Sequence, residues 1–126
     1  MTSTFLVFLG AGLGGALRHG VNQLSVKWLG MAFPYGTLAI NILGSCLMGL
    51  IAGWFAVKGE GLPQHLRLFL TTGILGGFTT FSAFSLDAIL LWERGDIAAA
   101  AIYVLASVGL SLAALMAGLA LMRGLS

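Results

Sequence analysis

Charge is what this sequence of 126 residues has least of. It contains six lysines and arginines and four acidic residues, so only 8% of the residues are charged while 59% are hydrophobic. A water-soluble domain of this length needs far more charge on its surface. The composition therefore argues against a soluble enzyme or a nucleic-acid-binding domain, and it indicates a chain whose main solvent is lipid.

Residues that carry chemistry are also scarce. The single cysteine, Cys46, excludes an intrachain disulfide, and a small packing residue is its simplest interpretation. His19 and His65 are isolated, so they give no zinc-ligand spacing. No nucleophile stands with a base and an orienting acid, and there is no phosphate-binding loop. We therefore predict no enzyme, and the uncharged N-terminus predicts no removable signal peptide.

Four hydrophobic segments are long enough to cross a bilayer, which takes about 20 helical residues. We place them at about residues 4–24, 36–57, 66–92 and 97–122. The connections between them are short: Ser25–Tyr35, Lys58–His65 and Glu93–Asp96. The predicted fold is an all-α integral membrane protein with four transmembrane helices, which form a single domain over residues 1–126.

Positive charge is divided evenly between the two sides of this arrangement. Three basic residues fall on each side, namely Lys58, Arg67 and Arg123 on one and Arg18, Lys27 and Arg94 on the other. The positive-inside rule therefore gives no preferred orientation. Either the chain inserts in both orientations and pairs with an inverted copy, or the count over such short loops is uninformative.

Small residues recur at helical spacing in the first two segments: Gly10 and Gly14, then Ser45, Gly49 and Gly53. Such positions let membrane helices approach closely. Their number suggests more helix contacts than four helices need among themselves, so we expect a homodimer.

Polar residues form one stripe in the second segment and another in the fourth. Residues at i, i+4 and i+8 share a helix face. The stripe in the second segment is Thr37, Asn41 and Ser45, and the stripe in the fourth is Tyr103, Ser107 and Ser111. The two stripes could line one narrow wet path, or they could hydrogen-bond neighbouring helices.

The third segment carries the most specific pattern, TTGILGGFTTFSAFS over residues 71–85. Adjacent Gly76 and Gly77, followed by β-branched Thr79 and Thr80, predict a helix broken at mid-membrane. One helix should end near Gly76 and the next start near Thr80, with Thr80 as its N-cap. Freed carbonyls over residues 76–79 would suit Na⁺, or neighbouring hydroxyls could satisfy a simple kink.

Three phenylalanines, Phe78, Phe81 and Phe84, follow the glycine pair. The positive edge of an aromatic ring can contact an anion weakly, although aromatic stripes more often belong to a core.

These patterns together resemble the Fluc (CrcB-type) fluoride channels over nearly the whole chain. The resemblance rests on GGFTTFSAFS (residues 76–85), on GTLAINILG (residues 36–44) and on an early glycine-rich helix that ends in arginine. It implies an antiparallel, dual-topology homodimer in the bacterial inner membrane. Such a dimer has two pores that let F⁻ leave the cell passively, which protects it from fluoride toxicity.

The resemblance also implies residue roles. A single Na⁺ at the dimer centre would be held by the backbone carbonyls of Gly76 and Thr79. The pore residues would be Phe81, Phe84, Asn41, Ser107 and Ser111, with Tyr103 and Thr37 beside them. Arg18 would lie at a vestibule, where it could instead snorkel to the lipid headgroups. The family commonly has Glu where this chain has Asp87, so the role of Asp87 is the least defined.

Two other functions are compatible with four short helices. A small dual-topology multidrug exporter would need a carboxylate inside its first span, where this chain has only Arg18. A membrane scaffold that transports nothing would explain the glycines, but not the Asn41 stripe beside a broken helix.

Overall fold

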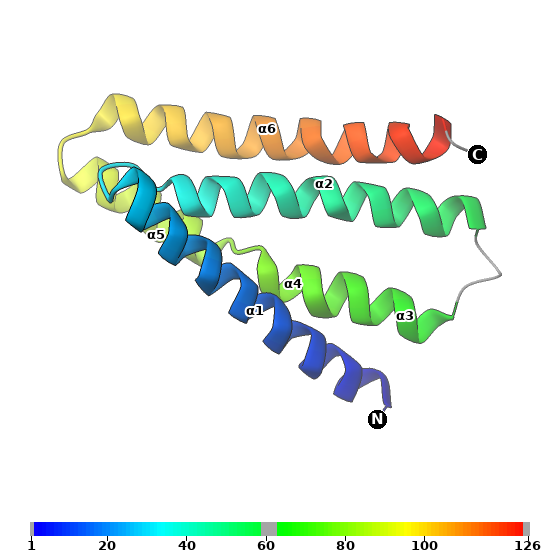
Figure 1. Ribbon diagram of the computed structural model, residues 1–126. Helices are drawn as coiled ribbons and strands as arrows, with labels where there is room; N and C mark the ends of the chain where they lie inside the picture. The colour runs from blue at the N-terminus through cyan, green and yellow to red at the C-terminus, as the bar shows by residue number, and fades with distance from the viewer. Residues whose placement is uncertain (1, 59–62, 125–126) are drawn as a thin grey trace.

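The computed structural model describes residues 2–58 and 63–124, and the chain folds into four long helical segments (Figure 1). The first two are α1 (Thr2–Leu29) and α2 (Tyr35–Lys58), and the last is α6 (Ile97–Gly124). The third is composite and contains α3 (Gln64–Leu68), the π-helical turn η2 (Phe69–Leu75), α4 (Gly76–Phe78) and α5 (Ser82–Glu93). Each segment has the length and apolar composition to cross a membrane, which confirms the predicted all-α, four-helix architecture.

The helices extend further than predicted, most clearly in α1. We predicted that it ends at Leu24, but it continues to Leu29 and stops at Gly30, whose φ of +80° favours glycine. Its length is about 42 Å. The residues after Leu24 contain no glycine or proline before Gly30, so nothing ends the helix earlier. The predicted connection 58–65 includes residues 59–62, with Glu60, which lie outside the described part of the chain.

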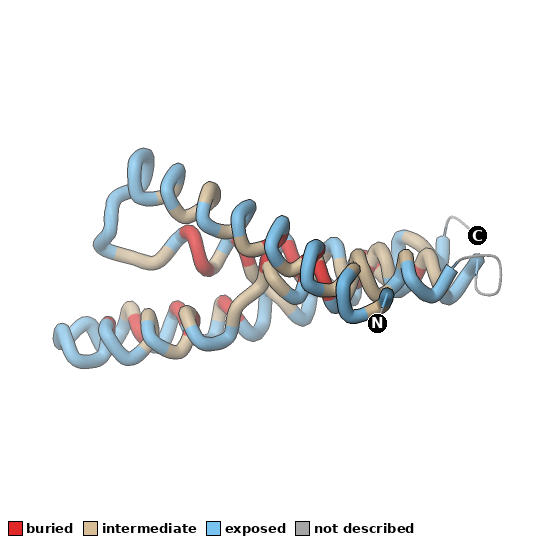
Figure 2. Tube along the Cα trace, turned by 90° about the horizontal axis from the view of Figure 1, so that it is seen from below, coloured by how far each residue is buried: buried red, intermediate tan, exposed pale blue. Residues whose placement is uncertain are grey.

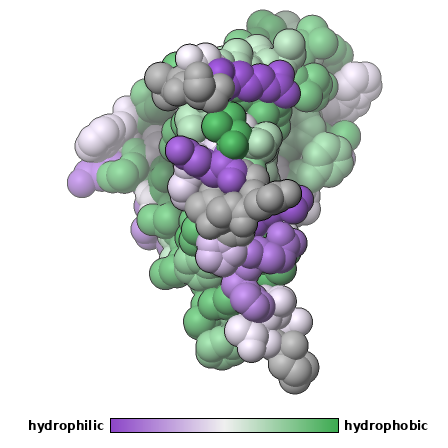
Figure 3. Space-filling view, turned by 90° about the vertical axis from the view of Figure 1, so that its right-hand side faces the viewer, coloured by the Kyte–Doolittle hydropathy of each residue, from purple (hydrophilic) through white to green (hydrophobic). Residues whose placement is uncertain are grey.

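Helix α1 begins and α6 ends at the same end of the bundle, which we call the terminal end (Figure 1). The connections between α1 and α2 and between α5 and α6 lie at the opposite end, which we call the loop end. Figure 3 looks at the terminal end, where hydrophilic residues gather while hydrophobic residues cover the flanks. Side chains such as Phe8, Trp28 and Leu105 are 73%, 74% and 72% exposed, as a surface solvated by lipid requires.

The most extensive helix contact joins α2 to α6, which run side by side (Figure 1). Glycines make it possible. A Cβ atom on Gly118 would lie 2.6 Å from the Cys46 carbonyl oxygen and 2.8 Å from the Leu50 nitrogen, and one on Gly49 would collide with the Leu115 carbonyl. The two backbones therefore touch directly, as small-residue seams allow in membranes.

A second seam joins α1 to the third segment. A Cβ atom on Gly10 would lie 2.8 Å from the Phe69 carbonyl oxygen, and one on Gly14 would collide with the Ile74 carbonyl. The predicted seam glycines are thus used inside the chain, with buried residues on the inner sides of the helices (Figure 2). Because the single chain already uses these seams, they no longer argue for a homodimer.

The third segment is interrupted, but not where the glycine pair predicted. Gly76 and Gly77 are helical, and the chain leaves the helix at Thr79, Thr80 and Phe81. A Cβ atom on Gly77 would collide with the backbone of Ala11, so close packing on α1 explains this glycine. Packing against α1 overrides the low helix propensity of the pair, and the predicted helix end near Gly76 was two residues too early.

We predict that Gly118→Ala lowers the free energy of unfolding by about 1–3 kcal/mol, because the added methyl group meets backbone atoms of α2 that cannot turn aside. The matched control is Gly109→Ala on the same helix, where a Cβ atom would have no neighbour within 4 Å. Thermal unfolding in detergent measures both, and equal melting temperatures for the two variants would contradict the seam.

Candidate functional site

The interruption of the third segment is held by Asn41 of α2. Its side-chain amide pairs with the backbone of Thr80 in both directions: the Thr80 N–H donates to Asn41 Oδ1 at 2.9 Å, and Asn41 Nδ2 donates to the Thr80 carbonyl at 3.0 Å. One side chain therefore replaces the helical partners that Thr80 loses. Asn41 Nδ2 carries a second N–H, for which the described residues show no partner.

Thr80 makes a capping hydrogen bond to the next helix, although the N-cap position is Phe81, one residue later than predicted. The Thr80 hydroxyl accepts a hydrogen bond of 3.1 Å from the Ala83 N–H, and the helix itself begins at Ser82. The Thr79 hydroxyl donates to the Leu75 carbonyl at 2.9 Å. The side chains at the interruption thus satisfy several of the backbone groups that a break exposes.

These bonds release two particular carbonyls. In a continuous α-helix the Thr80 N–H would donate to the Gly76 carbonyl, and the Ala83 N–H would donate to that of Thr79. The first N–H is diverted to Asn41 and the second to the Thr80 hydroxyl. Gly76 and Thr79 are the residues whose carbonyls the resemblance assigns to Na⁺, and both have lost their helical donor.

Beside the interruption lies a groove with a volume of about 480 Å³, open on one side of the chain. It brings together residues from α2, the third segment and α6. Seven of the predicted site residues line it, namely Asn41, Gly76, Thr79, Phe81, Phe84, Ser107 and Ser111. Gly44 also lines it, and it leaves room for the Thr79 methyl group, which a Cβ atom would strike.

Two hydroxyls in this groove are unpaired. The Oγ atoms of Ser107 and Ser111 are buried and have no hydrogen-bond partner among the described residues. Ser107 as a whole is only 5% exposed. An unpaired buried hydroxyl costs about 1–3 kcal/mol. Two such groups, one turn apart on α6, therefore point to a hydrogen-bond acceptor that residues 2–58 and 63–124 do not supply.

An aromatic row leads away from the groove toward the loop end. Phe81 is 77% exposed, and its ring lies 5.6 Å from that of Phe84. The Phe84 ring lies 5.3 Å from that of Tyr103, which is fully buried. Tyr103 in turn meets Phe33 edge-on, with ring centroids 5.6 Å apart at 88°. The first two phenylalanines are the predicted pore residues, whereas Phe33 was not predicted.

Polar groups accompany Tyr103 at the end of this row. Its hydroxyl donates to Asp87 Oδ2 at 3.2 Å. Asp87 and the buried Thr37 line a second cavity of about 260 Å³, together with Phe33. The structure therefore groups Tyr103, Thr37 and Asp87 beyond Phe84, between the groove and the loop end.

Arg18 is the one predicted residue that stands apart. It is not among the residues that line either cavity, and it lies 11 residues before the end of α1, about 16 Å along the helix. Its Nε atom is buried, with no hydrogen-bond partner among the described residues. Because α1 is longer than predicted, Arg18 lies further from the loop end of this helix than the sequence suggested.

Sequence reasoning missed two partnerships. It left open whether the Asn41 stripe lines a wet path or bonds a neighbouring helix and did not identify Thr80 as the partner, and it did not single out Phe33. Residues 41 and 80 are 39 positions apart, and Phe33 lies in a connection. No local periodicity reports a contact between a side chain and a distant backbone group, so no signal in the sequence could have revealed either.

The sequence of this chain matches those of known proteins. A family model described as "CrcB-like protein, Camphor Resistance (CrcB)" matches residues 5–119. A protein of Methylobacterium nodulans named "Fluoride-specific ion channel FluC" is 65% identical, with 98% of each chain covered. Proteins of the same name from Rhodopseudomonas palustris (strain BisB5) and Granulibacter bethesdensis are 64% and 58% identical. They cover 96% and 99% of this chain and 97% and 98% of their own length.

We predict that Asn41→Leu lowers the free energy of unfolding by about 2–4 kcal/mol, because it leaves both the N–H and the carbonyl of Thr80 without a partner in an apolar medium. Ser45→Ala is the control, since Ser45 lies one turn further along α2 and lines the same groove. Both variants are compared by thermal unfolding in detergent. If Asn41→Leu unfolds at the temperature of the control, Asn41 does not hold the interruption.

Proposed function

This chain belongs to the CrcB-like family, and from that premise we propose how the groove beside the interrupted third segment works. The protein is a fluoride channel. It is a multi-pass protein of the bacterial inner membrane, where it lets F⁻ leave the cell passively and so protects the cell from fluoride toxicity. The family is one of ion channels and not of enzymes, and the multidrug exporter and the inert scaffold are no longer needed to explain the sequence.

The observation that carries the assignment of the groove is the pair of unpaired hydroxyls, Ser107 and Ser111. Fluoride is small and strongly hydrated, so a path through lipid must replace its water with hydrogen-bond donors. The two hydroxyls and the second N–H of Asn41 are donors of this kind along one groove. The three side chains are uncharged.

Uncharged donors suit conduction better than a fixed cation would. A full positive charge in contact with the ion in a low-dielectric path would hold it by several kcal/mol or more. A conducting site must bind the ion weakly enough to release it. The ring edges of Phe81 and Phe84 add partial positive charge without a formal cation. We assign Arg18 to attracting anions from a distance, because it lies outside the groove.

The groove needs a cover, which we propose is a second, inverted copy of this chain. Half-buried Asn41 and Thr80 line a groove that would otherwise open to hydrocarbon, where exposed polar groups are costly. Phe81 also projects from the surface and is 77% exposed. An inverted partner is compatible with the charge distribution, since Lys58, Arg67 and Arg123 lie toward the terminal end and Lys27 and Arg94 toward the loop end. Two copies would enclose two paths, with each interruption at mid-membrane.

We further propose that the two copies share one Na⁺ at their centre. The carbonyls of Gly76 and Thr79 fit a hard cation, because both are oxygen ligands and both have lost their helical donors to Asn41 and Thr80. The ion would be coordinated by carbonyl oxygens from the interrupted third segments of both copies and so hold the two copies together. Within each chain, Asn41 fixes the backbone from which these carbonyls project.

Phe81→Ile should reduce fluoride efflux from liposomes by about tenfold or more, because the ring edge is removed while the groove stays filled. Phe5→Ile on α1, where Phe5 is 58% exposed, is the control and should conduct like the wild type. A fluoride electrode measures the release. Full conduction by Phe81→Ile would remove this ring from the path. A multidrug exporter or an inert scaffold would release no fluoride. The absence of fluoride efflux from liposomes with the wild-type protein would therefore overturn the proposed function itself.

Replacing Na⁺ with N-methyl-D-glucamine should lower the melting temperature of the dimer in detergent. An ion that binds only the folded dimer stabilises it by about 2.7 kcal/mol at 100 times its dissociation constant. K⁺ at the same concentration is the control for ionic strength and should stabilise less. Equal melting temperatures in all three salts would contradict a sodium site formed by Gly76 and Thr79.

A further inference from the structure

The connection between α1 and α2 covers the cavity beside Tyr103. It runs from Gly30 to Pro34, and its Phe33 ring lies 5.6 Å from the Tyr103 ring and 4.9 Å from that of Tyr35. The same ring lines the 260 Å³ cavity, along with Thr37 and Asp87. Phe33 therefore lies between the loop end and Tyr103, the last ring of the row that starts at the groove.

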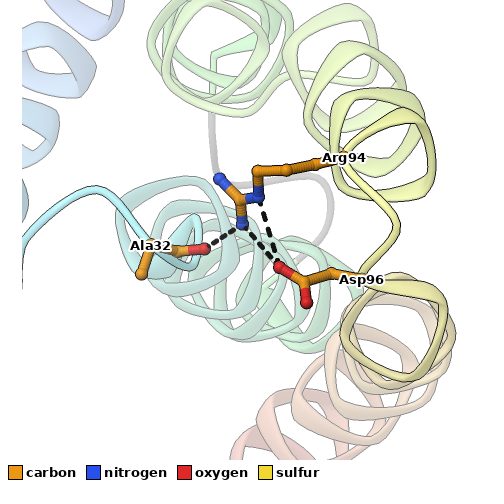
Figure 4. Close-up of polar contacts among 3 residues, drawn as sticks. All are labelled: Ala32, Arg94 and Asp96. Atoms are coloured by element: carbon orange, nitrogen blue, oxygen red, sulfur yellow. Dashed lines mark hydrogen bonds and ion pairs between the residues drawn. The ribbon is translucent and has the colours of Figure 1, made fainter.

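One contact ties this connection to the opposite loop. The Arg94 guanidinium, which follows α5, donates through Nη2 to the carbonyl of Ala32, the residue just before Phe33 (Figure 4). The guanidinium also binds Asp96, with Nε and Nη2 each 3.2 Å from Oδ2. Residues 32 and 94 are 62 positions apart, so this contact joins the two connections at the loop end.

The fork geometry of arginine explains the arrangement. A planar guanidinium can donate to a carboxylate and to a carbonyl at the same time, whereas an ammonium group offers a single centre. Asp96 orients the guanidinium from two residues away, and the guanidinium then fixes Ala32. The Ala32 carbonyl has no other partner among the described residues, so Arg94 decides where it points.

We propose that Arg94 is a positioning residue for fluoride conduction, which holds Phe33 against Tyr103 and so keeps the row of rings that starts at the groove in its conducting arrangement. This inference rests on the proposed function of the groove. Phe33 braces the Tyr103 ring, and Tyr103 carries its hydroxyl to Asp87 at 3.2 Å. When the connection is released, the Tyr103 ring loses its contact with Phe33, and its hydroxyl loses its fixed position beside Asp87.

The effect of releasing the connection should be moderate. Arg94 and Asp96 have side chains that are 49% and 55% exposed, and ion pairs of this kind are weak in water. We expect Arg94→Gln to reduce fluoride efflux by about threefold to tenfold, without a change in the dimer elution volume. Arg94→Lys keeps the charge and one donor, so it should recover part of the rate.

The control separates positioning from simple attraction of anions. Lys27→Gln removes the same charge near the same end, from an exposed site in the last turn of α1. If Arg94 acts only through its charge, Lys27→Gln and Arg94→Gln reduce efflux alike and Arg94→Lys conducts fully. That pattern would overturn the proposal.

A double-mutant comparison tests the route through Phe33. Phe33→Leu keeps most of the volume but removes the ring edge that meets Tyr103, so it should reduce efflux as Arg94→Gln does. The double variant should be no slower than the slower single variant, because both changes release the same contact. Multiplied losses, or faster efflux in any of the three, would overturn the proposal.

A measurement without fluoride transport completes the test. For this measurement, 4-fluorophenylalanine is incorporated at position 33 alone in the wild type and in each variant. The ¹⁹F resonance is recorded in chloride buffer that contains no fluoride. Arg94→Gln should shift or broaden this resonance, and Lys27→Gln should leave it unchanged. An unchanged resonance in Arg94→Gln would overturn the proposal even if the wild type conducts fluoride. If the proposed function itself is wrong, liposomes with the wild-type protein will release no fluoride.

Discussion

The pairing of the Asn41 amide with the backbone of Thr80 is the interaction on which the rest of the structure depends. A chain that leaves the helix inside a bilayer exposes N–H and carbonyl groups that lipid cannot satisfy. Here one side chain from α2 satisfies a donor and an acceptor of the same residue, at 2.9 and 3.0 Å. The interruption can therefore persist, and the groove, the exposed Phe81 and the released carbonyls all follow from it.

This pairing also divides the polar groups by role. Thr80 uses both of its backbone groups for Asn41, and its hydroxyl accepts from the Ala83 N–H and lies 3.4 Å from the Ser82 hydroxyl. Ser107 and Ser111 keep unpaired hydroxyls on the facing helix. One side of the groove thus consists of hydrogen-bonded groups of Asn41 and Thr80. The other side, on α6, carries hydroxyl donors that have no acceptor among the described residues. Such preorganised, uncharged donors can replace water around an anion and still release it.

The sequence predicted the larger features well, because hydrophobic length and composition determine which segments can cross a bilayer. The four spans, the interrupted third segment and the capping hydroxyl of Thr80 were all expected. The glycine pair was misread, since Gly76 and Gly77 stay helical, whereas Gly10 and Gly14 form a packing seam as predicted, but within the chain. Whether a glycine breaks a helix or lets a neighbour approach depends on the facing surface, which periodicity does not describe. For the same reason, no sequence pattern revealed the contacts of Arg94 with Ala32 and of Phe33 with Tyr103.

The most direct test of this account is whether fluoride contacts the second N–H of Asn41. Solid-state NMR of the protein in bilayers can follow the Asn41 side-chain amide, the Thr80 amide and, as a lipid-facing reference, the Gly109 amide while fluoride replaces chloride. The account predicts that the Asn41 Nδ2 protons shift with fluoride, that Thr80 remains hydrogen-bonded to Asn41, and that Gly109 is unchanged. An Asn41 side chain that does not respond to fluoride would contradict it.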